Sequence, residues 1–446
     1  MPVSAARATA FDILLRMERE NAYAAESLHG SRYAKLSAVD YALATELVMG
    51  ALRWRSCLDR QISEASSQTP DKLDLEVLTA LRLGIYQMRY LERIPVRAAI
   101  HEAVELVKRA RKQSAASFVN AVLRRVQAIP PRFSRWADAI HSVATASALM
   151  ELSAHPLWLV ERWIREFGLE TAKAICIHDQ SVPNTVVRFR DCAAEEELLG
   201  QGIELAPGKL LSRAFRVLSG NVTRTKAFAE RRVVIQDEAS QLVALLTGRG
   251  RRLLDCCAAP GGKTAILAER NPESAITAVE LHSHRARLLR RLVSADNVRV
   301  VTADARNLPL AVQFERVLAD VPCSGTGTLA RNPDIKWRLR PEDLPDLQSR
   351  QLAILDSAMA RVAVGGKLVY STCSLENEEN SDVVEKALTA DTNFKLLDAR
   401  AELQRLQREG ELVLEDLDSI LSRKYLRIIP GRHESDGFFA AILERI

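Results

Sequence analysis

The chain has 446 residues, of which 47% are hydrophobic and 27% charged, and its formal net charge is +5. A chain of this length exceeds a single hydrophobic core, and its composition excludes a disordered, collagen-like or integral-membrane protein. The positive charge lies near the N-terminus, because residues 1–150 hold 21 Lys and Arg against 15 Asp and Glu.

Residues 1–132 are predicted to form an all-helical bundle. Apolar residues recur there at helical spacing, and Pro130–Pro131 is expected to end the bundle because proline cannot donate in a helix. Charged residues interrupt the apolar ones from the start, which indicates a helix and not a signal peptide. The basic clusters Lys108–Lys112 and Arg124–Arg125 fit an RNA-phosphate face and a solvated helix face equally well.

The remainder of the chain is predicted to contain three further segments. Residues 133–183 continue the helical spacing as a linker, and residues 184–235 change towards short strands in a small α/β subdomain. In residues 236–446 short β-branched runs alternate with helical stretches. That alternation predicts a doubly wound α/β domain, in which helices cover both faces of a parallel sheet.

A glycine turn follows the first strand of this α/β domain, in the stretch "DCCAAPGGKTAIL". Gly261 and Gly262 permit a tight turn and close backbone approach before a helix that starts near Lys263. The spacing matches neither the dinucleotide motif G-x-G-x-x-G nor a P-loop. The turn is therefore a weak signal for a ligand site when taken alone.

The next three strands each end in an acidic residue, Glu280, Asp304 and Asp320. Ligands of such sheets bind beyond the carboxyl ends of the strands, where Glu280 can accept from ribose hydroxyls and Asp304 from an adenine amino group. Three carboxylates would repel a pyrophosphate but suit a cationic nucleoside. We therefore predict S-adenosylmethionine as the cofactor.

Two cysteines follow strand-like runs, Cys323 in "DVPCSGTG" and Cys373 in "YSTCSL". A lone cysteine is more often a small buried residue than a catalytic one. Carbon 5 of cytosine is a poor nucleophile, however, and an enzyme that methylates it must first add a thiolate to carbon 6. Asp320 is placed to supply or hold the proton on the ring nitrogen, and the second thiol can serve the final elimination.

Four strings, "CAAPGGKT", "DVPCSGTGTLARNPDIKWR", "LVYSTCSLENEEN" and "DGFFAAILER", closely resemble the RNA cytosine-C5 methyltransferases of the Nol1/Nop2/Sun type. The helical residues 1–132 resemble the NusB-like RNA-binding domain that bacterial 16S rRNA members of this family carry. The resemblance implies a Rossmann-like methyltransferase domain over residues 236–446 and an RNA-recognition role for residues 184–235. It implies 16S rRNA or a small-subunit assembly intermediate as partner, and cytosine 967 as target.

The resemblance also implies residue roles. Cys373 is the nucleophile, Cys323 assists product release, and Asp320 serves both catalysis and cofactor binding. The cofactor site joins Glu280, Asp304 and Asp320 to a loop that consists of Cys257, Ala258, Ala259, Pro260, Gly261, Gly262 and Lys263. The stretch Lys336, Trp337, Arg338 and Arg340 suits a single-stranded RNA channel, although Trp337 fits simple packing equally well.

Several alternatives remain at this point. A DNA cytosine methyltransferase would assign attack to Cys323, but the chain lacks a long target-recognition insertion after Cys373. An amino methyltransferase needs an Asn/Asp-Pro-Pro-aromatic loop, where this chain has "DVPC". Another RNA cytosine-C5 methyltransferase, acting on tRNA or 23S rRNA, and a non-catalytic NusB-like RNA-binding factor are the remaining rivals.

The sequence predicts no metal centre and no membrane attachment. The seven cysteines include no C-x-x-C pair, and the eight histidines make no H-E-x-x-H motif. No segment is apolar over the length needed to cross a bilayer. Reduced thiols and a cytoplasmic location are therefore expected.

Overall fold

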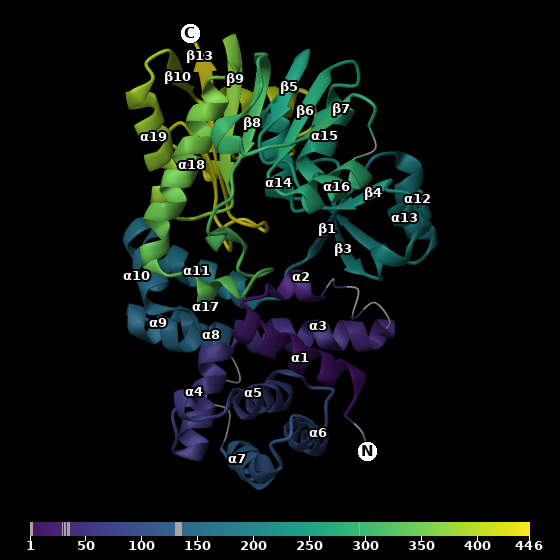
Figure 1. The fold of residues 1–446 in the computed structure, drawn as a ribbon, viewed down its shortest axis with the longest axis vertical. Helices are drawn as coiled ribbons and strands as arrows, with labels where there is room; N and C mark the ends of the chain where they lie inside the picture. Colours follow the sequence, from purple (N-terminus) through teal and green to yellow (C-terminus); the bar gives the residue numbers. More distant parts are fainter. Residues whose placement is uncertain (1–2, 29, 31–32, 34–35, 130–135, 294) are drawn as a thin grey trace. The chain divides into compact units, whose positions relative to one another are not determined.

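The structure is a computed structural model that describes residues 3–28, 30, 33, 36–129, 136–293 and 295–446 (Figure 1). The chain forms two compact units, one of residues 1–182 with 329–338 and one of residues 183–328 with 339–446. The predicted bundle end at Pro130–Pro131 lies outside the described residues. The division into four segments at residues 132, 183 and 235 stays a prediction.

The first unit is helical, as its apolar spacing predicts. Its main core joins side chains from α1 to α7, with fully buried Phe11, Leu47, Leu81 and Leu123 among them. The helices are α1 (Ala5–Glu20), α2 (Ala24–Leu28), α3 (Ala38–Arg53), α4 (Arg55–Ser66), α5 (Leu75–Tyr90), α6 (Val96–Arg109), α7 (Ala116–Ala128), α8 (Trp136–His141), α9 (Ala146–Ser153), α10 (Leu157–Phe167) and α11 (Leu169–Gln180).

Residues 329–338, which include α17 (Ile335–Arg338), belong to this helical unit although they lie far along the chain. Lys336 Nζ donates to the carbonyls of Arg53 and Ala154, each at 2.9 Å, at the ends of α3 and α9. Trp337 Nε1 donates to the Leu52 carbonyl at 2.6 Å. Carbonyls in the last helical turn lack intrahelical partners, so this segment caps helix ends.

These contacts correct the RNA-channel prediction for Lys336 and Trp337. Lys336 is 1% exposed, and its ammonium donates hydrogen bonds to two backbone carbonyls, so it does not face a solvent channel. Trp337 packs against the core of the helical unit, so packing is the better account of its side chain. Arg338 donates to the carbonyls of Asn21 and Ala22 at the end of α1.

Acidic neighbours pair with much of the basic cluster at residues 108–112. Arg109 makes two hydrogen bonds with Asp12, at 2.8 and 2.9 Å, and Lys112 lies 2.9 Å from Asp74. Lys108 pairs with its own helix neighbour Glu105. Exposed ion pairs of this kind are weak, so RNA phosphates could replace the acidic partners. Contact between this cluster and RNA therefore stays a prediction.

A small antiparallel sheet opens the second unit, where the sequence predicts a small α/β subdomain. Its strand order is β2-β3-β1-β4, and a core around Val187, Leu198 and Val233 joins it to α12. The elements are β1 (Thr185–Phe189), α12 (Cys192–Gly200), β2 (Glu204–Pro207), β3 (Ala214–Ser219), α13 (Lys226–Ala229) and β4 (Val233–Ile235).

The rest of this unit is built on a nine-stranded mixed sheet of order β11-β12-β13-β9-β8-β5-β6-β7, with β10 beside β13. The five strands β5 to β9 are parallel, as predicted, and β13 runs antiparallel to β9. The strands are β5 (Arg252–Asp255), β6 (Ala275–Glu280), β7 (Val298–Thr302), β8 (Phe314–Asp320), β9 (Val362–Thr372), β10 (Phe394–Leu397), β11 (Leu421–Ser422), β12 (Tyr425–Ile428) and β13 (Phe438–Arg445).

Helices cover both faces of this sheet because neighbouring strand residues point to opposite sides. Leu253 and Leu318 share a core with residues of α14, α15 and α20, whereas Leu254 and Val317 share a core with residues of α18 and α19. Figure 1 shows α18 and α14 beside the strands of this sheet. The helices are α14 (Glu238–Leu246), α15 (Gly262–Arg270), α16 (Ser283–Leu292), α18 (Leu344–Met359), α19 (Ser381–Ala390) and α20 (Ala399–Arg408).

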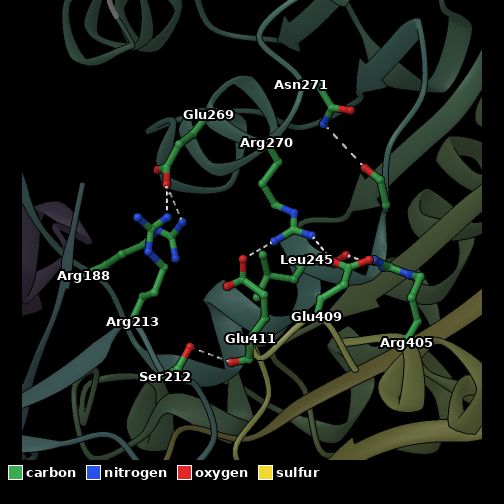
Figure 2. A network of polar contacts seen from close by, with 11 residues as sticks. Arg188, Ser212, Arg213, Leu245, Glu269, Arg270, Asn271, Arg405, Glu409 and Glu411 are labelled. Carbon is green, nitrogen blue, oxygen red and sulfur yellow. Dashed lines mark hydrogen bonds and ion pairs between the residues drawn. The ribbon is translucent and has the colours of Figure 1, made fainter. Parts of the chain in front are cut away.

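Ion pairs at the C-terminal end of α15 join the small sheet to the large one. Figure 2 shows Arg188 and Arg213 reaching the same oxygen of Glu269, at 2.8 and 2.7 Å. The next residue, Arg270, pairs with Glu409 at 2.6 Å and with Glu411 at 2.5 Å, both just after α20. Arg188 and Arg270 are buried, so salt screens their ion pairs less than it screens pairs between exposed side chains.

No helix within the described residues is long and apolar enough to cross a membrane. Within the same part of the chain, no group of three or more His, Cys, Asp and Glu side chains is arranged to hold a metal ion.

Candidate active site

The sequence-predicted site residues converge on one edge of the large sheet. The chain leaves β5 towards β6 on one side, while β8 lies on the other side, so the strand order reverses between β5 and β8. In open α/β sheets this switch point opens a crevice at the carboxyl ends of the strands. The loop after β5 and the loop after β8 therefore face the same crevice.

The loop after β5 turns sharply at Gly261. This residue has φ +119°, and a Cβ added to it would lie 2.6 Å from Val293 and 2.7 Å from Leu289. The backbone N–H of Ala258 donates to the carbonyl of Val279 on β6 at 2.9 Å. Arg285 donates to the Ala259 carbonyl at 3.2 Å. Only glycine fits the turn, and α15 begins at the next residue, Gly262.

The three predicted acids differ in their surroundings. Glu280 is 5% exposed, and its Oε1 accepts from the backbone N–H of His282 at 2.8 Å. Asp304 lies two residues beyond β7 and is partly exposed, and Arg306 lowers the pKa of its carboxyl through hydrogen bonds from side chain and backbone. Glu280 is therefore a fixed, buried acceptor, and Asp304 is a solvated one.

Asp320, at the end of β8, is held by two neighbouring elements. Its Oδ2 lies 2.8 Å from Lys263 Nζ, and its Oδ1 accepts from the Ser371 hydroxyl at 2.8 Å. Burial favours the neutral form of Lys263, but the Asp320 carboxylate outweighs that effect and raises the pKa of the ammonium. Lys263 is thus a cation at the crevice, and it also lies within electrostatic range of Cys373.

The two cysteines meet at this edge of the sheet. Cys323 Sγ lies 3.3 Å from Cys373 Sγ, and both residues are partly buried. They come together because β8 and β9 are parallel neighbours in which Asp320 pairs with Ser371. The hydrogen bond with Cys373 and burial raise the pKa of the Cys323 thiol. The two sulfurs are thus in direct contact at the ends of neighbouring strands.

Sequence reasoning missed the buried carboxylate of Glu379, which holds the two cysteine turns together. Its Oε1 accepts from the backbone N–H of Ser324 at 2.8 Å, and its Oε2 accepts from the hydroxyls of Ser324 and Ser374. Each serine directly follows a cysteine, so the repeated Cys-Ser pair was the available signal. Gly327 N–H adds a hydrogen bond to the Cys373 carbonyl at 2.9 Å.

Asp255, at the end of β5, was also missed. Its carboxyl is 1% exposed and accepts from the Thr264 hydroxyl at 2.7 Å. Burial raises the pKa of Asp255 to about 7. The neighbouring Cys256 is 1% exposed and belongs to the core of the sheet.

Comparison with known proteins places this site in a family. A model described as 16S rRNA methyltransferase RsmB/F matches residues 243–444, and a NusB family model matches residues 4–128. A probable ribosomal RNA small subunit methyltransferase B of Bacillus subtilis is 34% identical over 461 residues, and the match covers 100% of this chain and 100% of the relative. The chain belongs to the RsmB/F methyltransferase family. The ribosomal RNA small subunit methyltransferase B of Pseudomonas putida is 33% identical over 439 residues, or 94% of each chain.

Solved structures agree with the fold of this RsmB/F member. The crystal structure of PH0851 has a TM-score of 0.79 at 22% identity and covers 100% of both chains. NSun6 from Pyrococcus horikoshii, solved with the S-adenosylmethionine analogue SFG, has a TM-score of 0.55 at 21% identity and covers 66% of this chain and 99% of its own. The predicted NusB-like bundle, the methyltransferase fold and the enzymatic class are confirmed. Methyltransferases of this family use S-adenosylmethionine, as predicted.

Proposed function

We propose that the protein methylates carbon 5 of one cytosine in 16S rRNA, namely cytosine 967, through a covalent adduct with Cys373. The supporting observation is the contact between two thiols, 3.3 Å apart, beside the loop that follows β5. Methylation of carbon 5 needs a thiolate for attack on carbon 6 and a second group for the final elimination. Two sulfurs in one crevice match that requirement, whereas nitrogen methylation needs neither.

The charge near Cys373 supports attack by this residue. The thiolate is the nucleophilic form of cysteine. Lys263 places a positive charge near Cys373, where it offsets the negative charge of a thiolate. Cys373 then bonds to carbon 6, and Cys323 acts after methyl transfer, when the proton on carbon 5 leaves and the Cys373 bond breaks.

Asp320 is suited to contact the ring nitrogen next to the amino group of the cytosine. Lys263 and Ser371 fix its carboxylate at the end of β8, three residues before Cys323. A carboxylate held in this way can keep a proton on the ring nitrogen, which makes carbon 6 more open to attack. The same contact with Lys263 links the catalytic acid to the loop after β5.

The residues present fit S-adenosylmethionine. Gly261 packs closely against Val293 and Leu289, which fixes the turn of the loop after β5, and the buried, pre-oriented Glu280 carboxylate suits ribose hydroxyls. We assign the loop from Cys257 to Lys263, with Glu280, Asp304 and Asp320, to this site. When bound, the cofactor supplies an electrophilic methyl group, and the chain's own residues orient it beside the two thiols.

The turn at Gly261 provides a test of this assignment. Gly261→Ala is expected to weaken binding of S-adenosylmethionine at least ~10-fold, because the new Cβ clashes with Val293 and Leu289 and φ is left-handed. Titration calorimetry measures the change. Gly365→Ala is the matched control, since Gly365 has φ +70° but nothing within 4 Å of the added carbon. Equal affinity in the Gly261 variant and wild type would contradict the assignment.

The proposed substrate is tested on cellular RNA. Bisulfite sequencing of 16S rRNA should show one 5-methylcytosine that disappears when the gene is deleted and returns with the wild-type gene. A gene with Cys373→Ala should not restore it. Loss of a mark from tRNA or 23S rRNA instead would favour the alternative RNA substrates. Such a substrate, free rRNA or a small-subunit assembly intermediate, implies a cytoplasmic location for the enzyme.

A further inference from the structure

The contact between Cys323 and Cys373 has a chemical consequence apart from methyl transfer. Their sulfurs are 3.3 Å apart, and a disulfide has an S–S length of about 2.05 Å, so bonding needs a movement of roughly 1.2 Å. All seven cysteines lie within the described residues, and among them the sulfurs of Cys323 and Cys373 are the two found in contact. The two turns are already held side by side by Glu379 and by the hydrogen bond between Gly327 and Cys373.

We propose that Cys323 and Cys373 form a redox site, which a hydroperoxide converts to an intramolecular disulfide and a dithiol reductant restores. The Cys373 thiolate attacks one oxygen of the peroxide, the O–O bond breaks, and Cys373 becomes a sulfenic acid while hydroxide leaves. The Cys323 sulfur then attacks the Cys373 sulfur. The S–S bond forms, the S–O bond breaks, and the oxygen leaves as water with the Cys323 proton. Two thiols lose two electrons, and one hydrogen peroxide becomes two waters.

The surroundings favour this pair over the other cysteines. Both residues are partly buried and therefore reachable by a small peroxide, and Lys263 supplies a cation near Cys373. Cys57, Cys176 and Cys256 are buried, and Cys257, which is partly buried like the pair, makes no sulfur contact that is recorded among the described residues. Cys192 is exposed but has no recorded sulfur partner within the described residues.

Oxidation would stop the proposed reaction at its first step, because a sulfur in a disulfide cannot add to carbon 6. It would also protect Cys373, since a sulfenic acid captured by a neighbouring thiol does not proceed to irreversible acids. This functional consequence rests on the proposed roles of the two cysteines, whereas formation of the disulfide does not.

The test uses the full-length reduced protein and a small molar excess of hydrogen peroxide. Free thiols counted under denaturing conditions should fall from seven to five, and peptide mass spectrometry should find Cys323 linked to Cys373. Dithiothreitol should restore seven. In the Cys192→Ser variant, peroxide should still lower the number of free thiols by two, from six to four. In the Cys323→Ser variant no intramolecular disulfide should form, and peroxide should oxidise Cys373 beyond the sulfenic acid.

Two outcomes would overturn the proposal. One is oxidation of Cys373 to sulfinic acid in the wild type with Cys323 left free, and the other is thiol loss confined to other cysteines. Calorimetry with S-adenosylmethionine before and after peroxide reports whether the variant and oxidised proteins are folded. Because thiol counting needs no RNA, failure of the proposed methylation reaction and failure of the redox site give separate results.

Discussion

Cys373→Ala is expected to transfer no methyl group to 16S rRNA and to form no covalent protein–RNA adduct. Removal of a covalent nucleophile lowers turnover on the order of 10⁴-fold or more. Cys323, whose sulfur contacts that of Cys373, is assigned to the later elimination and does not replace the nucleophile. The measurement is transfer of label from methyl-labelled S-adenosylmethionine to RNA, followed by a denaturing gel. Binding of the cofactor should be retained, since the substitution leaves the loop after β5 unchanged.

Cys323→Ala should fail at a different step. Cys373 can still add to carbon 6 and the methyl group can still be transferred, but elimination is slowed. A labelled protein–RNA band should therefore survive denaturation in this variant and be faint in the wild type. The target base must leave any stack to reach both sulfurs, which costs a few kcal/mol and favours single-stranded or junction RNA.

Cys192→Ala is the control for both variants, because Cys192 is exposed and lies in α12 of the small sheet's subdomain. It should match the wild type in methyl transfer and in adduct level. A stable labelled adduct with Cys373→Ala but not with Cys323→Ala would reverse the two roles. That result would support the division of labour of a DNA cytosine methyltransferase.

The sequence was sufficient to predict where the candidate site lies. Strand ends are local features, since β-branched runs stop at Glu280 and Asp320, and the parallel order follows from the alternation of strands and helices. Parallel strands bring their carboxyl ends to one edge, so the loop at Gly261 and both cysteines had to be near one another. The distance between the two sulfurs and the hydrogen bonds that Glu379 accepts from both cysteine turns depend on side-chain packing. The spacing of residues along the sequence does not reveal that packing.

The largest error concerns Lys336, and its cause is physical. A run of cations beside an aromatic residue is solvated in most proteins, and lysine is almost never fully buried. The carbonyls that bury this one belong to Arg53 and Ala154, which are separated from it by 283 and 182 positions. Local pattern cannot reveal a partner at that separation. The antiparallel placement of β13 beside β9 is a long-range feature of the same kind.

Lys336→Met is expected to destabilise the helical unit. Methionine fills similar space but cannot donate, so the Ala154 and Arg53 carbonyls both lose the Lys336 donor, and the Arg53 carbonyl retains the donor from Gln180. A buried carbonyl without a partner costs about 1–3 kcal/mol, which lowers the thermal midpoint of the helical unit by roughly 2–12 °C. Lys226→Met, at a side chain 75% exposed, is the matched control and should shift the midpoint little.

The pH dependence of this loss separates charge from packing. Burial lowers the pKa of Lys336 to about 7. Of the neighbouring groups, Asp179 raises this pKa and Arg53 lowers it, and Cys176 and Cys57 also face the ammonium. The nearby His155 is buried and has a pKa well below its usual range. In the unfolded chain the lysine pKa is about 10.4, so between about pH 7 and 10 the unfolded state binds more protons. Wild-type stability therefore gains from this group as pH rises through that window, and Lys336→Met lacks the gain. Denaturant unfolding at pH 7 and pH 9.5 should show a larger difference between the two proteins at the higher pH. A difference that stays constant would show that the lost hydrogen bonds and packing, and not the buried charge, set the stability at this position.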